Sequence, residues 1–127
     1  MAGDNAQRKI VMHVNFAGEE LLSFVLNNIE NICDYYRERG TALELRVVCH
    51  GPGLHLLRRD SSPVRERLLD ISASRDELGL YACANTLERM TRAEGKRPEL
   101  VEPAILVPAG LPEIAELQNA GWVYLKP

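Results

Sequence analysis

The chain has 127 residues, of which 46% are hydrophobic and 26% are charged, and its formal net charge is -3. This length suffices for one domain with a buried core and is too short for two ordinary domains. The acidic balance argues against direct binding of nucleic acid, because phosphate binding needs a concentrated positive surface. No apolar run approaches the length of a membrane span, and the polar N-terminus lacks the apolar segment of a signal peptide. We therefore expect a cytoplasmic protein that does not associate with a membrane.

Residues 1–8 are polar, and we expect a flexible N-terminus followed by a single domain over residues 9–127. In that domain, runs rich in β-branched residues alternate with segments whose apolar residues recur at three- and four-residue steps, which predicts strands alternating with helices. The strands are expected over residues 9–14, 43–49, 78–83, 104–108 and 122–126, and the helices over 19–39, 54–59, from 63 onward, 86–94, and from 112 to a stop at Gly121. Ser62 is the expected N-cap of the third helix, and Pro112 is the expected first residue of the last. This alternation is typical of an α/β fold with a mostly parallel sheet and helices on both faces.

Cys83 lies where the third strand is expected to end and the next helix to begin. Asn85 and Thr86, which are N-cap residue types, come directly before the apolar helix position Leu87. A thiol at a helix N-terminus meets the positive end of the helix dipole and free N–H groups, and both favour its thiolate form. The local sequence thus fits a reactive cysteine, and it also fits a small buried apolar residue.

Three of the predicted strand ends carry distinctive residues, namely His50-Gly51-Pro52-Gly53, Cys83 and Pro108-Ala109-Gly110. Because the carboxyl ends of parallel strands share one edge of a sheet, these segments are expected to line a single site. Gly51 and Gly53 either expose backbone N–H groups to an anion or a substrate sulfur, or simply form a tight turn. His50 either holds a thiolate or shuttles a proton, or is a structural histidine, and His13 inside the first strand has a weaker claim.

The sequence contains three cysteines, Cys33, Cys49 and Cys83. Their odd number and irregular spacing predict free thiols in a reducing compartment. No CxxC or HxxxH pair accompanies them, so we predict no metal site.

Two pairs of side chains have two interpretations each. Asn28 and Asn31 share a face of the first helix beside its apolar stripe, which favours a buried or interfacial role over simple exposure. Trp122 and Tyr124 lie on one face of the last strand, where core packing is the default and an oligomer interface is the alternative.

The main concentration of basic residues lies in the middle of the chain. It consists of Arg58, Arg59, Arg65 and Arg67, which are interleaved with acidic residues. Such mixed charge favours a solvated face over an anion-binding site.

Several short motifs, taken together and in order, resemble the DsrE/DsrF-like (YchN-like) family. They are Asn28-Ile29 with Asn31, His50-Gly51-Pro52-Gly53, Ala82-Cys83-Ala84-Asn85-Thr86, Val107-Pro108-Ala109-Gly110, Leu117-Gln118 with Gly121, and the end of the chain at Lys126-Pro127. The resemblance runs from about residue 9 to residue 127. It implies a three-layer α/β/α fold with a five-strand, largely parallel sheet, and assembly as a homotrimer or hexamer.

The resemblance also implies a function. The best understood members of the family pass sulfane sulfur as a cysteine persulfide in sulfur relays, and their cysteine follows the third strand, where Cys83 stands here. The expected protein is an intracellular sulfur carrier, similar to a sulfurtransferase, that needs no cofactor and exchanges sulfur with donor and acceptor proteins. The residues expected to bind substrate or support Cys83 are His50, Gly51, Gly53, Asn85, Thr86, Gly110 and Asn28.

A second hypothesis remains open at this stage. The chain would then be a non-catalytic oligomeric module of the same fold that binds a small ligand or a partner, and Cys83 would be unreactive. A thiol pKa at or above that of a free cysteine would favour this alternative.

Overall fold

Five parallel strands form one sheet in the order β4-β3-β2-β1-β5. The computed structural model describes residues 7–127, so most of the expected flexible N-terminus, residues 1–6, lies outside the described residues. In chain order the elements are β1 (Arg8–Val14), α1 (Glu19–Glu38), β2 (Leu43–Cys49), the 3-10 helix η2 (Gly51–Leu56), α2 (Arg65–Ser74), β3 (Leu78–Cys83), α3 (Ala84–Glu94), β4 (Ala104–Val107), α4 (Gly110–Asn119) and β5 (Val123–Leu125). The expected α/β fold with a five-strand sheet is confirmed.

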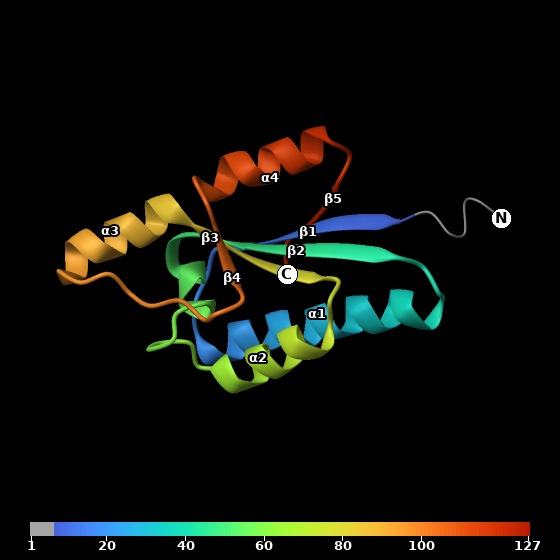
Figure 1. Ribbon diagram of the computed structural model, residues 1–127, viewed down its shortest axis with the longest axis horizontal. Coiled ribbons are helices and arrows are strands. Elements are labelled where there is room, and N and C mark those ends of the chain that lie inside the picture. Colours follow the sequence, from blue (N-terminus) through green and yellow to red (C-terminus); the bar gives the residue numbers. More distant parts are fainter. Residues whose placement is uncertain (1–6) are drawn as a thin grey trace.

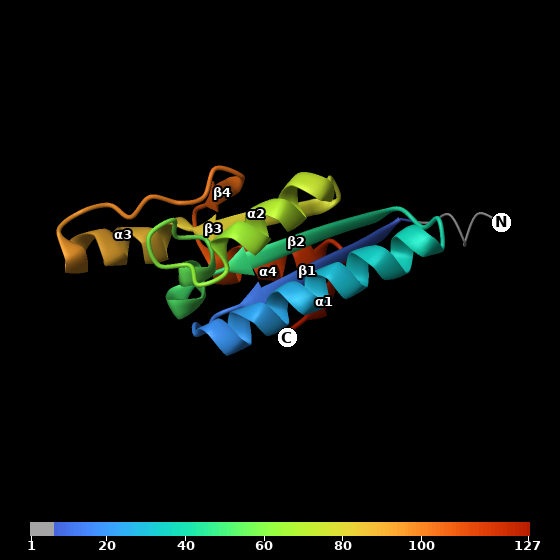
Figure 2. The ribbon, with the colours of Figure 1, turned by 90° about the horizontal axis from the view of Figure 1, so that it is seen from below.

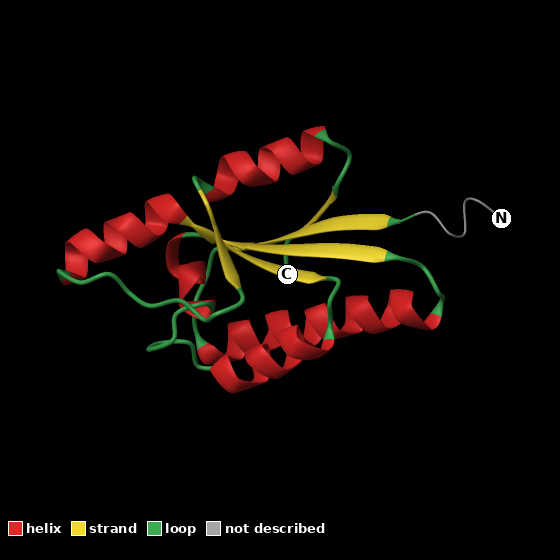
Figure 3. Ribbon diagram, in the orientation of Figure 1, coloured by secondary structure: helices red, strands yellow, loops and turns green. Residues whose placement is uncertain are grey.

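The helices form layers on both faces of the sheet. Helices α1 and α2 lie side by side on one face, and α4 covers the other (Figures 1 and 2). Helix α3 extends outward from the carboxyl edge of the sheet and buries only Leu87 from its own length (Figure 3). The loop and helix starts that surround this edge are therefore the part of the fold that positions a site.

The alternation of side chains along each strand divides the interior into two unequal cores. Met12 and Val14 of β1 belong to the larger core beneath α1 and α2, whereas Val11 belongs to the smaller core beneath α4. Because side chains alternate along a strand, His13 faces the α4 side with Val11. On β3, Leu80 and Ala82 likewise fill the larger core. The pleat therefore directs Cys83 toward the α4 side as well.

The smaller core explains the aromatic residues at the end of the chain. Trp122 is buried in it together with Ile114 and Leu117 of α4, and Tyr124 packs against it. The default interpretation of this pair as core residues is confirmed.

Several helix boundaries differ from the sequence predictions. The short helix expected over 54–59 is the 3-10 helix η2, which begins earlier, at Gly51. Helix α2 begins at Arg65 after Val64, so Ser62 is not its N-cap. The backbone N–H of Ser62 instead bonds to the carbonyl of Arg58 in the preceding turn. Helix α4 begins at Gly110, and Pro112 fits inside its first turn because N–H groups there have no helical acceptor.

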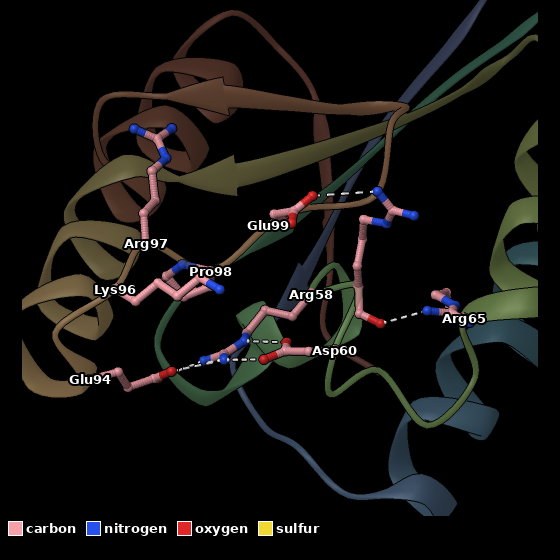
Figure 4. A pocket seen from close by; sticks show the side chains of 9 residues that line it. Arg58, Asp60, Arg65, Glu94, Lys96, Arg97, Pro98 and Glu99 are labelled. Carbon is pink, nitrogen blue, oxygen red and sulfur yellow. Dashed lines mark hydrogen bonds and ion pairs between the residues drawn. The ribbon is translucent and has the colours of Figure 1, made fainter.

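The prediction of a solvated basic face is wrong for Arg58. Its side chain is buried, with the residue only 5% exposed, and its guanidinium bonds to both oxygens of Asp60 and both oxygens of Glu94 at 2.7 to 2.9 Å. Figure 4 shows the guanidinium between the two carboxylates. These three residues, Arg58, Asp60 and Glu94, form a clamp that fixes the turn after η2 to the far end of α3. The guanidinium is therefore buried and paired with one neighbouring and one distant carboxylate, and is not part of a solvated face.

Part of the apolar surface has no cover in the described chain. Leu21, Phe24 and Tyr35 of α1 are about half exposed, at 48%, 51% and 50%. On the edge strand β5, Val123 and Leu125 are also exposed, and their register with Ile10 and Met12 directs them toward the α1 face. Within residues 7–127, no helix combines the length and the apolar character that crossing a membrane requires.

Gly53 shows how tightly η2 packs against the end of β1. A Cβ atom at this position would lie 2.1 Å from the carbonyl oxygen of Val14. We predict that Gly53→Ala lowers the free energy of unfolding by about 1–3 kcal/mol through overpacking, as measured by urea denaturation. The control is Gly40→Ala, where φ is +64 but no atom lies within 4 Å, so only backbone strain of about 1 kcal/mol is expected. Equal losses in the two variants would contradict the packing argument.

Candidate functional site

Cys83 ends β3 and is itself the N-cap of α3. Its backbone is extended, with φ -71 and ψ 115, and its Sγ accepts a hydrogen bond from the backbone N–H of Thr86 at 3.4 Å. The expectation that Asn85 or Thr86 caps this helix is wrong, because the chain already turns helical at Ala84. The helix therefore begins directly on the sulfur-bearing residue, which is 5% exposed.

Donors from two helices converge on the Cys83 sulfur. Burial by itself raises the pKa of this thiol. Polar groups that face the sulfur, namely the Thr86 hydroxyl and the backbone N–H groups of Thr86, Gly110 and Asn85, lower the pKa by more, so the net pKa lies below its ordinary value. Asn85 and Thr86 belong to the first turn of α3, and Gly110 begins α4. The thiolate is thus stabilised by fixed dipoles at the starts of α3 and α4.

Thr86 links this sulfur to the end of β2. The backbone N–H of Gly51 donates to Thr86 Oγ1 at 2.9 Å. Because the hydroxyl oxygen is the acceptor in that bond, its proton remains available for the Cys83 sulfur. Gly51 reaches this geometry at φ +55, a left-handed conformation that glycine adopts without strain.

Gly110 lies between Cys83 and His50. A Cβ atom on Gly110 would lie 2.9 Å from Cβ of His50 and 3.5 Å from Cβ of Cys83. A larger residue would push against His50, so glycine is what allows β2, β3 and α4 to meet closely here. The structure therefore brings together the three strand ends that were expected to share one edge.

His50 is the end of a histidine–tyrosine array that consists of His13, His50 and Tyr124. His13 Nε2 lies 2.6 Å from His50 Nε2, and His13 Nδ1 lies 2.6 Å from the Tyr124 hydroxyl. The two imidazole rings are stacked, with centroids 4.8 Å apart and planes inclined by 17°. His13 had a weaker claim than His50 from sequence, yet it occupies the centre of this array.

Both histidines of the array are uncharged near neutral pH. Burial, followed by repulsion from His50 and from Lys126, lowers the pKa of His13 to about 4. Burial and then Lys126 also lower the pKa of His50. Lys126 is held beside them by a hydrogen bond to Asn15 and by the ring of Phe16, whose centroid lies 5.0 Å from Nζ.

The remaining residues predicted for the site have different positions. Gly53 packs against β1, and the side chain of Asn85 is exposed in the first turn of α3. Asn28 does not lie where the sequence prediction placed it, beside Cys83. It lies on α1, which covers the opposite face of the sheet from Cys83, and it cannot support the sulfur. Its neighbour Asn31 is exposed rather than buried.

The other two cysteines lie in the larger core beneath α1 and α2. Cys49 and Cys33 are fully buried there. Burial raises the pKa of Cys49, and burial with the nearby Glu77 carboxylate raises the pKa of Cys33 to about 12. Among the described cysteines, Cys83 alone has a lowered pKa.

The described residues contain no group of three His, Cys, Asp or Glu side chains arranged to hold a metal ion. A surface pocket of about 420 Å³ lies elsewhere, between the Arg58 clamp and the loop that follows α3 (Figure 4). Its lining is almost entirely charged and of mixed sign, and consists of Arg58, Arg59, Asp60, Arg65, Glu94, Lys96, Arg97, Pro98 and Glu99.

The chain is similar in structure to a solved protein from Methanobacterium thermoautotrophicum. That protein, MTH1491, is described as a protein of unknown function, and the two superpose with a TM-score of 0.79 at 26% sequence identity. The likeness covers 94% of this chain and 99% of that chain, so it extends over the whole domain and supports the α/β fold. No protein-family model matches the chain, and no curated protein matches it.

The hydrogen bonds to Cys83 make a direct prediction for its titration. Thr86→Val removes the hydroxyl donor but keeps the backbone N–H, so we expect a higher pKa of Cys83 and several-fold slower alkylation by iodoacetamide at neutral pH. The rate is measured by mass spectrometry of the Cys83 peptide. Thr91→Val is the matched control, because the Thr91 hydroxyl bonds to Leu87 in the middle of the same helix. Unchanged alkylation in Thr86→Val would show that the hydroxyl does not stabilise the thiolate.

Proposed function

We propose that this protein is a sulfur carrier that holds sulfane sulfur as a persulfide on Cys83. The observation that carries the proposal is the convergence of donors from α3 and α4 on one sulfur atom, with a net lowering of the pKa of Cys83. A thiolate is the nucleophile in sulfur exchange, so a site built to favour it suits this chemistry. The order of motifs that resembles the DsrE/DsrF-like family, together with the five-strand parallel sheet, supports placing the chain in that family.

The proposed reaction exchanges one sulfur–sulfur bond for another. The Cys83 thiolate attacks the outer sulfur of a donor persulfide R–S–SH, a bond forms between Sγ and that sulfur, and the donor S–S bond breaks. The donor leaves as the thiolate R–S⁻, and Cys83 becomes Cys–S–SH with no net oxidation or reduction. An acceptor thiolate attacking the same outer sulfur reverses the process and regenerates Cys83.

The surroundings of Cys83 favour such a role over that of a redox-active disulfide. Cys33 and Cys49 are buried in the core on the other face of the sheet and have raised pKa values, so neither is placed to resolve a persulfide on Cys83. Sulfur would therefore have to leave to a separate acceptor. Free thiols of this kind suit the reducing cytoplasm, with donor and acceptor proteins as partners.

Mass spectrometry after incubation with a small-molecule persulfide donor tests the proposal. We expect the protein to gain the mass of one sulfur atom, reversible by dithiothreitol, and to lose this gain almost completely in Cys83→Ser. Cys49→Ser is the matched control, because Cys49 ends the adjacent strand but faces the core, and it should gain sulfur as the unsubstituted protein does. Equal sulfur gain in Cys83→Ser would contradict the assignment and favour the alternative of a non-catalytic binding module.

We also propose that the protein is a homo-oligomer, with a trimer or hexamer as the expected assembly. The supporting observation is the exposed apolar set on α1 and β5, where Phe24 is 51% and Val123 is 53% exposed. Two separate elements contribute to this set, and it lies on the face opposite to Cys83.

Light scattering coupled to size-exclusion chromatography measures the assembly. We predict that Phe24→Glu places a charge in the interface and lowers the measured mass to that of one chain. Leu69→Glu is the control, since Leu69 lies on α2 outside the set and is 36% exposed. A monomeric unsubstituted protein would rule out the proposed oligomer.

A further inference from the structure

The histidine–tyrosine array forms a continuous path of hydrogen bonds across three strands. Tyr124 comes from β5, His13 from β1, and His50 directly follows β2. Both ring nitrogens of His13 are used, one by the Tyr124 hydroxyl and the other by His50 Nε2. Sulfur exchange at Cys83 does not itself require three hydrogen-bonded side chains. The position of the array beside Cys83 therefore needs a separate explanation.

The protons of the array are constrained by its geometry. At 2.6 Å, one of the two facing Nε2 atoms must carry a proton and the other must accept it, because two bare or two protonated nitrogens repel each other. The Tyr124 hydroxyl can donate to Nδ1 of His13 or accept from it, so the neutral array has two arrangements of protons. In the arrangement where Nδ1 of His13 donates to Tyr124, Nε2 of His50 donates to Nε2 of His13, and Nδ1 of His50 is left without a proton. Among the described residues, only Nδ1 of His50 is a ring nitrogen of the array without a hydrogen-bond partner. A proton can therefore enter or leave the array at His50.

His50 is also the member of the array nearest to the sulfur. Its Cβ lies against Gly110, whose backbone N–H faces the Cys83 sulfur and whose own position adjoins Cβ of Cys83. The backbone N–H of His50 donates to the carbonyl of Val14 at 3.1 Å, which anchors His50 to the end of β1. His50 and Cys83 thus lie on either side of the same glycine.

The charged and titratable groups around the array come from every neighbouring element. From the β5 side these are Tyr124 and Lys126, and from β3 they are Tyr81 and Cys83. Arg46 of β2 is paired with Glu44 and with Glu113 of α4, and its guanidinium lies over the rings of Tyr81 and Trp122. Lys126 is the cation that acts on both histidines. The environment thus keeps the array neutral, which leaves His50 free to accept a proton.

We propose that His50 takes up the proton of the Cys83 thiol during sulfur transfer, and that His13 and Tyr124 are positioning residues that fix the protonation state of His50. This inference rests on the proposed function and adds to it the residues that set its pH dependence. It also assigns a role to His13 and Tyr124, which are far from Cys83 in sequence.

The proton and electron balance of this step is simple. When the neutral thiol attacks a donor persulfide R–S–SH, its proton passes to Nδ1 of His50, directly or through one water, as a bond forms between Sγ and the outer sulfur. The donor S–S bond breaks and R–S⁻ leaves. The imidazolium of His50 then protonates R–S⁻ to R–SH, and the array returns to its neutral state.

The pH profile of Cys83 tests this inference. Alkylation of Cys83 by iodoacetamide, followed by mass spectrometry from acid to alkaline pH, reports the thiolate without any need for sulfur transfer. We expect two inflections: one from the thiol and one at lower pH from the array. In Tyr124→Phe, protonated His13 loses its acceptor at Nδ1, so the lower inflection should move further toward acid. The rate of sulfur uptake from a small-molecule persulfide at neutral pH should fall several-fold in the same variant.

Tyr81→Phe is the matched control, because Tyr81 lies on the same face of the sheet but outside the array, and its lower inflection should stay in place. Circular dichroism verifies that both variants are folded. An unshifted lower inflection in Tyr124→Phe would overturn the inference even if Cys83 carries sulfur. A shifted inflection in a protein that takes up no sulfur would support the coupling of the array to Cys83 and overturn the proposed function instead.

Discussion

The hydrogen bond from the backbone N–H of Gly51 to Thr86 Oγ1 holds the site together. It joins the loop after β2 to the first turn of α3, and it leaves the Thr86 hydroxyl proton for the Cys83 sulfur. With Gly110 filling the space between Cys83 and His50, three strand ends approach each other closely enough to act on one atom. The geometry of the thiol therefore depends on backbone contacts between elements that are distant in sequence.

The three cysteines show how environment decides the chemistry of the same side chain. Cys49 and Cys83 end neighbouring strands, yet burial dominates at Cys49 and raises its pKa, whereas hydrogen bonds outweigh burial at Cys83 and lower it. The difference follows from the pleat, which turns Cys49 toward the larger core and Cys83 toward the starts of α3 and α4. A single-residue change of strand register would exchange these environments.

Much of the fold was predictable because its signals are local. The ranges of β2 and β3 agree with the sequence predictions, since short β-branched runs bounded by turn residues are typical of buried parallel strands. The predicted start of α2 is too early and the predicted starts of α3 and α4 are too late, because a cap depends on the local path of the backbone and not only on which residue types are nearby. Arg58 was misassigned because its two carboxylate partners include Glu94, which is 36 residues away in sequence.

The sequence by itself determined the α/β alternation, the strand-to-helix junction at Cys83, and the shared face of Trp122 and Tyr124, because each of these follows from local patterns. Only the tertiary structure decided that β5 pairs with β1 rather than with β4. That pairing brings Tyr124 to His13 across 111 residues of chain and completes the array that ends at His50. The physical reason is that strand order is set by how helices pack across the two faces of the sheet, which local sequence patterns do not encode.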